Sequence, residues 1–234
     1  GEELFDLTKD PDELVSVHGK KEYAAVQKDL EQELSRLQKL YSDNEPEKSG
    51  KKKAKNNTKG LKRKARQIKL QKVLHLEKPG GPLPKDLDPS AKPLTVGAWC
   101  TPESGDGVLV AQGGESIGYS LYLAGGKARF AVRSGGELKV VVSDLKIEVG
   151  KRTHIAGTLA ATGKLTVLVN GKAAGQAPGH LLPSKPSDGL NVGDDAGSLV
   201  ADYTTPTKLK GSLEDIRIYW GVLDAKGMRA WASQ

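Results

Sequence analysis

Two adjacent carboxylates, Asp194 and Asp195, are the residues whose type and position best suit metal binding. With Gly193 and Gly197 beside them, they offer the oxygen ligands that calcium prefers. We therefore expect calcium as a cofactor, held by Asp194 and Asp195. The segment does not have the D-x-D-x-D-G spacing of a strong calcium motif, so a polar turn after a strand over 190–193 is the alternative.

A second set of residues suits sugar binding, because aromatic rings stack on the apolar faces of sugars and polar side chains bind their hydroxyl or sulfate groups. Its aromatic members are Tyr119, Tyr122, Phe130, Tyr203 and Trp220. From it we predict a ligand site on a concave face, made of Tyr119, Tyr122, Arg133, Gln112 and Asp106. Since only 5% of the residues are aromatic, the alternative is that rings such as Trp99 and Trp220 fill a hydrophobic core.

The sequence contains no complete active site. Its only cysteine, Cys100, excludes an internal disulfide and a cysteine-based zinc site, and its place in an alternating strand suits a small buried apolar side chain. No two of the four histidines lie three or four positions apart, so the spacing of a zinc site is missing as well.

Basic residues concentrate in one segment. Residues 48–78 hold 13 Lys and Arg and one acidic residue, Glu77, a net charge of +12, whereas the rest of the chain carries −5. Such a tract attracts anionic polymers through counterion release. It contains no aromatic side chain to stack on single-stranded bases, so we do not expect nucleic acid as a partner, and a solvated spacer is the alternative. No run approaches the ~20 apolar residues of a membrane span.

The elements before the tract are a short strand and a helix. Residues 4–7 form an apolar run that ends before Asp10-Pro11. Over 20–41, apolar side chains recur in steps of three and four, which places them on one face of a helix: Tyr23, Val26, Leu30, Leu34, Leu37 and Tyr41. A helix of this length is marginal by itself in water and needs a partner surface. Residues 45–70 are rich in lysine and predict a linker.

Residues 71–234 predict an all-β domain. Gly-Gly pairs at 113–114, 125–126 and 135–136 separate β-rich runs, and turns at this spacing are typical of a sandwich or barrel. Asn170-Gly171 predicts a type I′ hairpin turn within 164–177. Another alternating strand places Leu213, Asp215, Arg217 and Tyr219 on one face, opposite Ile216, Ile218 and Trp220. We therefore predict a mainly β, antiparallel sandwich of two sheets, with a short helix after Leu223.

The first 44 residues resemble the C-terminal tail of the sulfatase family. There a strand of pattern E-L-[YF]-D-L leads to D-P-x-E and then to a helix; the matching residues are Glu3, Leu4, Phe5, Asp6, Leu7, Asp10, Pro11 and Glu13. The resemblance implies a parent arylsulfatase-like enzyme, a sulfuric ester hydrolase, whose divalent metal and formylglycine lie upstream of this chain. Cys100 and Pro102 have the spacing of the formylglycine motif Cys-x-Pro-x-Arg, but Ser104 replaces its arginine.

Residues 72–225 resemble a laminin-G-like, concanavalin A-like jelly roll. The matching segments are LTVGAW (94–99), GYSLYL (118–123), LTVLVNGK (165–172), LNVGDD (190–195) and GSLEDIRIYWGVLDA (211–225). The resemblance implies a jelly-roll sandwich in which His154 is a packed, hydrogen-bonded core histidine. Sulfatases with such a lectin-like domain are secreted bacterial enzymes, which implies a periplasmic or secreted location.

We therefore expect a sulfatase tail over 1–44, a basic linker over 45–70 and a jelly roll over 71–234. The expected function is the non-catalytic C-terminal part of a sulfatase. Its lectin-like module would tether the enzyme to a carbohydrate polymer, including a sulfated polysaccharide, or to a protein partner, and so raise the local substrate concentration. The alternative is a stand-alone glycan-binding or protein-interaction module.

Overall fold

A computed structural model gives the fold and describes residues 17–27, 70–203 and 206–234. The chain divides into two units, Gly1–Lys62 and Arg63–Gln234. In the first unit, the 3-10 helix η1 (Lys21–Tyr23) passes into α-helical residues 24–27.

These residues are the start of the predicted helix over 20–41, and the rest of that helix lies outside the described residues. So do the predicted strand over 4–7 and the predicted linker up to residue 69.

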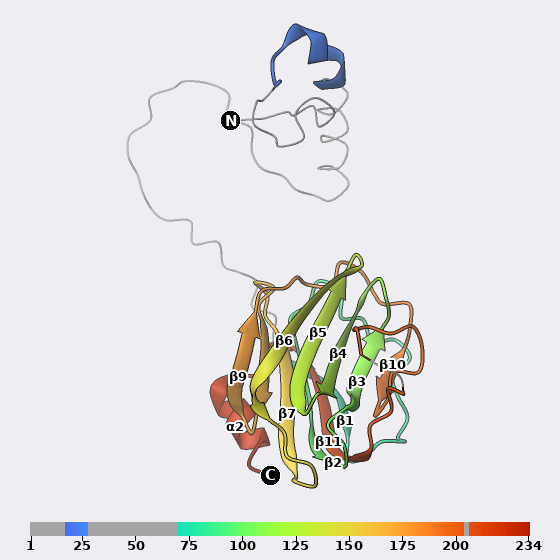
Figure 1. Cartoon of the computed structure of the whole chain (residues 1–234), viewed down its shortest axis with the longest axis vertical. Coiled ribbons are helices and arrows are strands. Elements are labelled where there is room, and N and C mark those ends of the chain that lie inside the picture. The colour runs from blue at the N-terminus through green and yellow to red at the C-terminus, as the bar shows by residue number, and fades with distance from the viewer. Residues whose placement is uncertain (1–16, 28–69, 204–205) are drawn as a thin grey trace, which may run out of the picture. The chain divides into compact units, whose positions relative to one another are not determined.

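The second unit is a sandwich of two antiparallel sheets (Figure 1). One sheet has the strand order β1-β11-β2-β7-β8-β9 and the other the order β10-β3-β4-β5-β6. The strands are β1 (Gln71–Leu76), β2 (Leu94–Pro102), β3 (Gly107–Gly113), β4 (Gly118–Ala124), β5 (Lys127–Ser134), β6 (Glu137–Lys146), β7 (Thr153–Leu159), β8 (Leu165–Val169), β9 (Lys172–Ala177), β10 (Leu190–Val192) and β11 (Gly211–Trp220). The predicted mainly β, concanavalin A-like jelly-roll sandwich is therefore confirmed.

The turns lie where the sequence predicts them. Gly125-Gly126 joins β4 to β5, and Gly135-Gly136 joins β5 to β6. Between β8 and β9, Asn170 and Gly171 have φ values of +48° and +73°. Positive φ at both central residues is what a type I′ turn requires, and its twist matches that of the two strands.

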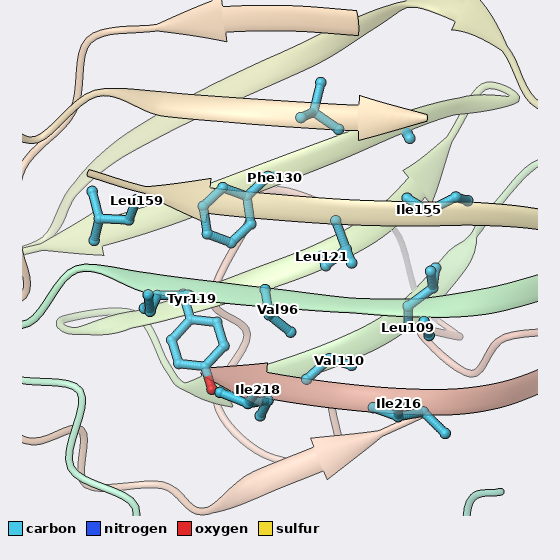
Figure 2. Close-up of a cluster of buried hydrophobic side chains, with 14 of the residues drawn as sticks. Val96, Leu109, Val110, Tyr119, Leu121, Phe130, Ile155, Leu159, Ile216 and Ile218 are labelled. Carbon is cyan, nitrogen blue, oxygen red and sulfur yellow. The ribbon is translucent and has the colours of Figure 1, made fainter. Parts of the chain in front are cut away.

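The core lies between the two sheets, and Figure 2 shows Val96, Ile155 and Leu159 of one sheet facing Leu121 and Phe130 of the other. Full burial of such a side chain stabilises the fold by about 1.5–3 kcal/mol. Cys100 is fully buried in the same cluster, and burial raises the pKa of its thiol to about 12. This position agrees with the small buried apolar side chain predicted for it.

A β-bulge changes the predicted faces of β11. Glu214 pairs with Trp99 and Arg217 with Gly97, so β11 has one residue more than β2 between these two pairs. Asp215 takes up the irregularity with a φ of +48°, a conformation that aspartate tolerates better than most residues. Leu213 is consequently buried in the core instead of sharing the outer face with Asp215, and its predicted face was wrong.

The predicted C-terminal helix is α2 (Ala225–Trp231). The carboxylate of Asp224 caps its first turn by accepting a hydrogen bond from Gly227 N at 2.7 Å. Met228 and Trp231 pack against Ala156, so α2 covers the outer face of the six-stranded sheet (Figure 1). Within the described part of the chain, no helix has the length and apolar character needed to cross a bilayer.

Candidate ligand-binding site

The bulge brings chemically active side chains together on the outer face of the six-stranded sheet. Strand pairing places Glu214, Trp99 and His154 in one row across β11, β2 and β7. It also pairs His75 of β1 with Arg217. Side chains opposite one another in such rows lie about 4.5–5.5 Å apart at their Cβ atoms, close enough to act as a group.

Asp215 is the centre of this group. Its carboxylate accepts hydrogen bonds from Arg217 Nε at 2.6 Å and Nη2 at 2.8 Å, and from Trp231 Nε1 at 2.8 Å. His75 Nε2 lies 2.8 Å from Asp215 Oδ1 and 3.2 Å from Glu77 Oε1. The bulge therefore serves to turn one carboxylate toward three partners from three different elements.

Arg152 borders the group on the side of β7. Its Nε donates to Glu214 Oε2 at 3.0 Å, and its guanidinium lies 3.8 Å above the centre of the Trp99 ring. The Arg152 side chain is 43% exposed, whereas the Trp99 residue beneath it is only 8% exposed. The face of Trp99 is thus covered by one surface arginine.

His154 lies between two tryptophans in the same layer. Its ring centre is 5.4 Å from that of Trp99 and 4.6 Å from that of Trp231, both in edge-to-face contact. Burial lowers the pKa of His154 to about 4. The residue is packed as predicted, but the predicted hydrogen bonding is wrong for its side chain, because neither ring nitrogen has a partner among the described residues. Trp99 Nε1 likewise has none.

A cavity of about 390 Å³ opens beside these residues. It is lined by His75, Glu77, Lys78, Arg152, Glu214, Asp215, Arg217 and Gln234. Its size lies within the range of ligand pockets, and its lining mixes carboxylates, cations and an amide. It can therefore donate and accept hydrogen bonds with one polar ligand.

The structure does not bring the five predicted sugar-binding residues together. Tyr119 is fully buried in the core between the sheets, and burial raises the pKa of its hydroxyl above its usual value. Gln112 is also buried and donates from Nε2 to the carbonyl of Leu87 at 2.8 Å. A ligand on the outer face of the five-stranded sheet does not reach Tyr119 or Gln112.

The other three predicted residues lie apart from these two. Tyr122 is on the outer face of the five-stranded sheet, in edge-to-face contact with Tyr203 at 4.9 Å. On the same face, Arg133 donates to Val200 O at 2.7 Å and to Asp202 at 2.9 Å. Asp106, in the β2–β3 turn, accepts from Gly125 N at 2.8 Å. The part of Tyr122, Arg133 and Asp106 in ligand binding stays a prediction.

The predicted calcium ligands lie in the segment after β10. Asp194 Oδ1 accepts from Thr207 Oγ1, while Asp195 Oδ2 accepts from Val200 N at 3.0 Å and from the Tyr203 hydroxyl. Asp195 Oδ1 is buried with no hydrogen-bond partner. In residues 17–27, 70–203 and 206–234, no three His, Cys, Asp or Glu side chains gather into a group that suits a metal ion. Calcium at these two residues stays a prediction.

The sequence contained a partial signal for the cavity. The segment 211–225 is one of the five that match the jelly-roll family, and it supplies Glu214, Asp215 and Arg217. His75, Glu77 and Lys78 carried no such signal, because they lie about 140 residues from Asp215 in sequence. Arg152 stood out in neither composition nor spacing.

Comparison with known proteins identifies the family. A laminin-G-like family model, described as the concanavalin A-like lectin/glucanases superfamily, matches residues 80–227. A comparison with curated protein sequences gives no match.

Among solved structures, the CBM40 domain of the Ruminococcus gnavus IT-sialidase, bound to α2,3-sialyllactose, has a TM-score of 0.50 and 15% identity over 60% of this chain and 82% of that one. A SAP-like pentraxin of Limulus polyphemus has a TM-score of 0.48 and 16% identity over 70% and 81%. Domain 4 of a Geobacillus stearothermophilus GH43 arabinanase, in complex with arabinotriose, has a TM-score of 0.46 and 20% identity over 61% and 68%. At these identities the likeness concerns the fold alone. Because the family model covers more than half of the sequence, the chain belongs to the concanavalin A-like lectin/glucanases superfamily.

Proposed function

We propose that residues 70–234 form a carbohydrate-binding module and that its ligand occupies the cavity beside Asp215. The observation that carries the proposal is the cavity itself, which is lined by carboxylates and by guanidinium groups, one of them Arg152 above the Trp99 ring. The fold shared with a sialyllactose-binding CBM40 domain supports this class of ligand by analogy.

The chemistry of the cavity suits a polyhydroxyl ligand. Each sugar hydroxyl can donate to a carboxylate oxygen and accept from a guanidinium N–H at the same time. Glu214 and Arg152, held together at 3.0 Å, offer such a pair of groups to one hydroxyl. Hydrogen bonds to charged groups are worth about 1.5–3 kcal/mol, so a few of them suffice for binding.

Isothermal titration of the full chain against a panel of neutral and acidic oligosaccharides tests this function. We expect binding to at least one of them, and Arg152→Gln should weaken it about tenfold or more, since a charge-assisted hydrogen bond is lost. Lys151→Gln is the matched control: Lys151 pairs with Glu148 and does not line the cavity. No binding by any oligosaccharide would contradict the proposal and favour a protein-interaction module.

We further propose that the module belongs to a sulfatase, which it holds near its polymer outside the cytoplasm. The support is the run of matching residues from Glu3 to Glu13. Reading the coding sequence upstream of Gly1 tests it. Several hundred residues with a signal peptide and a Cys/Ser-x-Pro-x-Arg motif would support the sulfatase, whereas a start codon just before Gly1 would contradict it and favour a stand-alone module.

Calcium at Asp194 and Asp195 is a separate proposal. Its support is the buried, unpartnered oxygen Asp195 Oδ1, beside a second carboxylate and the Thr207 hydroxyl. Such oxygen donors suit calcium, which takes six to eight ligands and completes its shell with water or carbonyl groups. A midpoint of thermal unfolding that rises with added calcium, and does not rise in Asp195→Asn, would support the site. A midpoint that is the same in calcium and in chelator would contradict it.

A further inference from the structure

Most of the charges that line the cavity are paired with one another. Asp215 binds Arg217 through two nitrogen atoms, at 2.6 and 2.8 Å, and Glu214 binds Arg152 at 3.0 Å. His75 lies between Glu77 and Asp215, within 3.2 Å of both carboxylates. The lining thus holds three carboxylates beside three permanent cations and one histidine, and its charge is close to balanced.

A balanced lining gives an anionic ligand no advantage. A sulfate or carboxylate group that approaches Arg152 also approaches Glu214, and one that approaches Arg217 meets Asp215. The attraction of the cation is then offset by repulsion from its partner, while the anion still loses its water. An uncharged hydroxyl meets no such repulsion and can bridge both members of a pair without separating them.

The Trp99 ring fixes the position of Arg152 at the cavity. The guanidinium of Arg152 lies 3.8 Å above the centre of the Trp99 ring, and the Arg152 side chain is 43% exposed. Because Trp99 is only 8% exposed and does not line the cavity, a sugar there meets the Arg152 side chain and not the indole ring.

Half of the cavity lining comes from residues outside the segment that matches the family. His75, Glu77 and Lys78 precede residue 80, and Gln234 follows residue 227. The family match therefore does not determine what the cavity binds, and the ligand class must be inferred from this chain's own side chains.

We infer that the cavity beside Asp215 binds uncharged saccharides in preference to sulfated or carboxylated ones, through hydrogen bonds to its paired charges. This inference rests on the proposed carbohydrate-binding function. It separates two roles within the chain: the basic residues over 48–69 attract polyanions, and the cavity does not.

Nitrogen NMR of the tryptophan side chains of the full chain tests the inference, because the Trp99 ring contacts Arg152 of the cavity lining and lies outside the basic tract. The indole signal of Trp99 is assigned with Trp99→Phe. The probes are a neutral oligosaccharide from the titration panel and its chemically sulfated form. We expect the neutral probe to shift the Trp99 signal to saturation, and the sulfated probe to shift it with at least tenfold lower affinity.

A charge variant sharpens the test. Glu214→Gln removes the carboxylate beside Arg152, so the affinity of the sulfated probe at Trp99 should rise about tenfold. Glu148→Gln, which removes a carboxylate outside the cavity, should leave that affinity unchanged.

The outcomes separate this inference from the proposed function. If the sulfated probe shifts the Trp99 signal as tightly as the neutral one, or if the neutral probe binds without shifting it, the inference is wrong and carbohydrate binding stands. If no probe binds the chain at all, the proposed function itself fails.

Discussion

Trp231 Nε1 donates a hydrogen bond of 2.8 Å to Asp215 Oδ2, and this bond joins the last helix to the bulge of β11. The two residues belong to different parts of the site. Asp215 lines the cavity, whereas Trp231 is buried behind it, against Ala156 and the His154 ring. The docking of α2 and the geometry of the cavity therefore depend on the same carboxylate.

Replacing Asp215 should destabilise the whole sandwich. Asp215→Ala leaves Arg217 without its carboxylate in a setting where that side chain is only 15% exposed, and it also removes the acceptor of Trp231. Breaking a largely buried pair in this way costs about 3–5 kcal/mol. Urea unfolding followed by circular dichroism measures the loss. Asp144→Ala, an exposed carboxylate on β6, should change stability by less than about 0.5 kcal/mol, and an equal loss in both variants would contradict this role for Asp215.

A methyl group at Gly97 should disturb the docking of α2. A Cβ atom there would lie 2.8 Å from Ala156 Cβ, 2.9 Å from Ile155 O and 3.0 Å from the Trp231 ring, all closer than normal contacts. Gly97→Ala should therefore lower the free energy of unfolding by about 1–3 kcal/mol.

Gly189→Ala is the control, because no atom lies within 4 Å of a Cβ at that position. Urea midpoints that coincide for these two variants would mean that α2 does not pack on Gly97 as described.

The strands could be predicted because their signals are local. Leu165, Val167 and Val169 alternate with less buried residues along β8. Asn170-Gly171 then supplies the two positive φ values of a type I′ turn, which continues such a strand into a tight hairpin. The burial of Tyr119 was also predictable in principle, since it alternates in register with Leu121 of the same strand and both side chains face the core.

The candidate site could not be predicted in the same way. The bulge at Asp215 adds one residue to β11, and the adjacent Glu214 and Asp215 are both acidic, so the polar pattern does not show which of them is the extra one. The contact between His75 and Asp215 spans 140 residues and depends on which strand is the neighbour of β11. Sequence alternation fixes the face of a strand but not its neighbour.

Cys100 should be unreactive in the folded protein. Its side chain is fully buried, and burial raises the pKa of the thiol to about 12, so the nucleophilic thiolate is absent at pH 8. A disulfide reagent that releases a coloured thiol should therefore label Cys100 in the native chain only as fast as the chain unfolds. In concentrated urea the same thiol should react within the mixing time, which serves as the control. Rapid labelling of the native chain would contradict the position given to Cys100.

The stability of the sandwich should fall as the pH drops from about 6.5 to 4, and His154 should be responsible for much of that fall. Burial lowers the pKa of His154 to about 4 in the folded state, against a value of 6.5 for an unburied histidine. Between these two pH values the unfolded chain binds a proton at His154 that the folded chain does not. The contribution of His154 to stability is therefore fully present above pH 6.5 and is lost progressively toward pH 4. A shift of this size corresponds to about 3 kcal/mol.

Urea unfolding at pH 7, 6, 5 and 4 measures the slope of this loss. His154→Phe cannot take up a proton and keeps a ring between Trp99 and Trp231, so its stability should change much less over the same range. His180→Phe is the matched control, since His180 is 61% exposed, and it should retain the slope of the unchanged protein. If His154→Phe retains that slope as well, the loss of stability in acid arises from other groups, and burial does not lower the pKa of His154 in the folded protein.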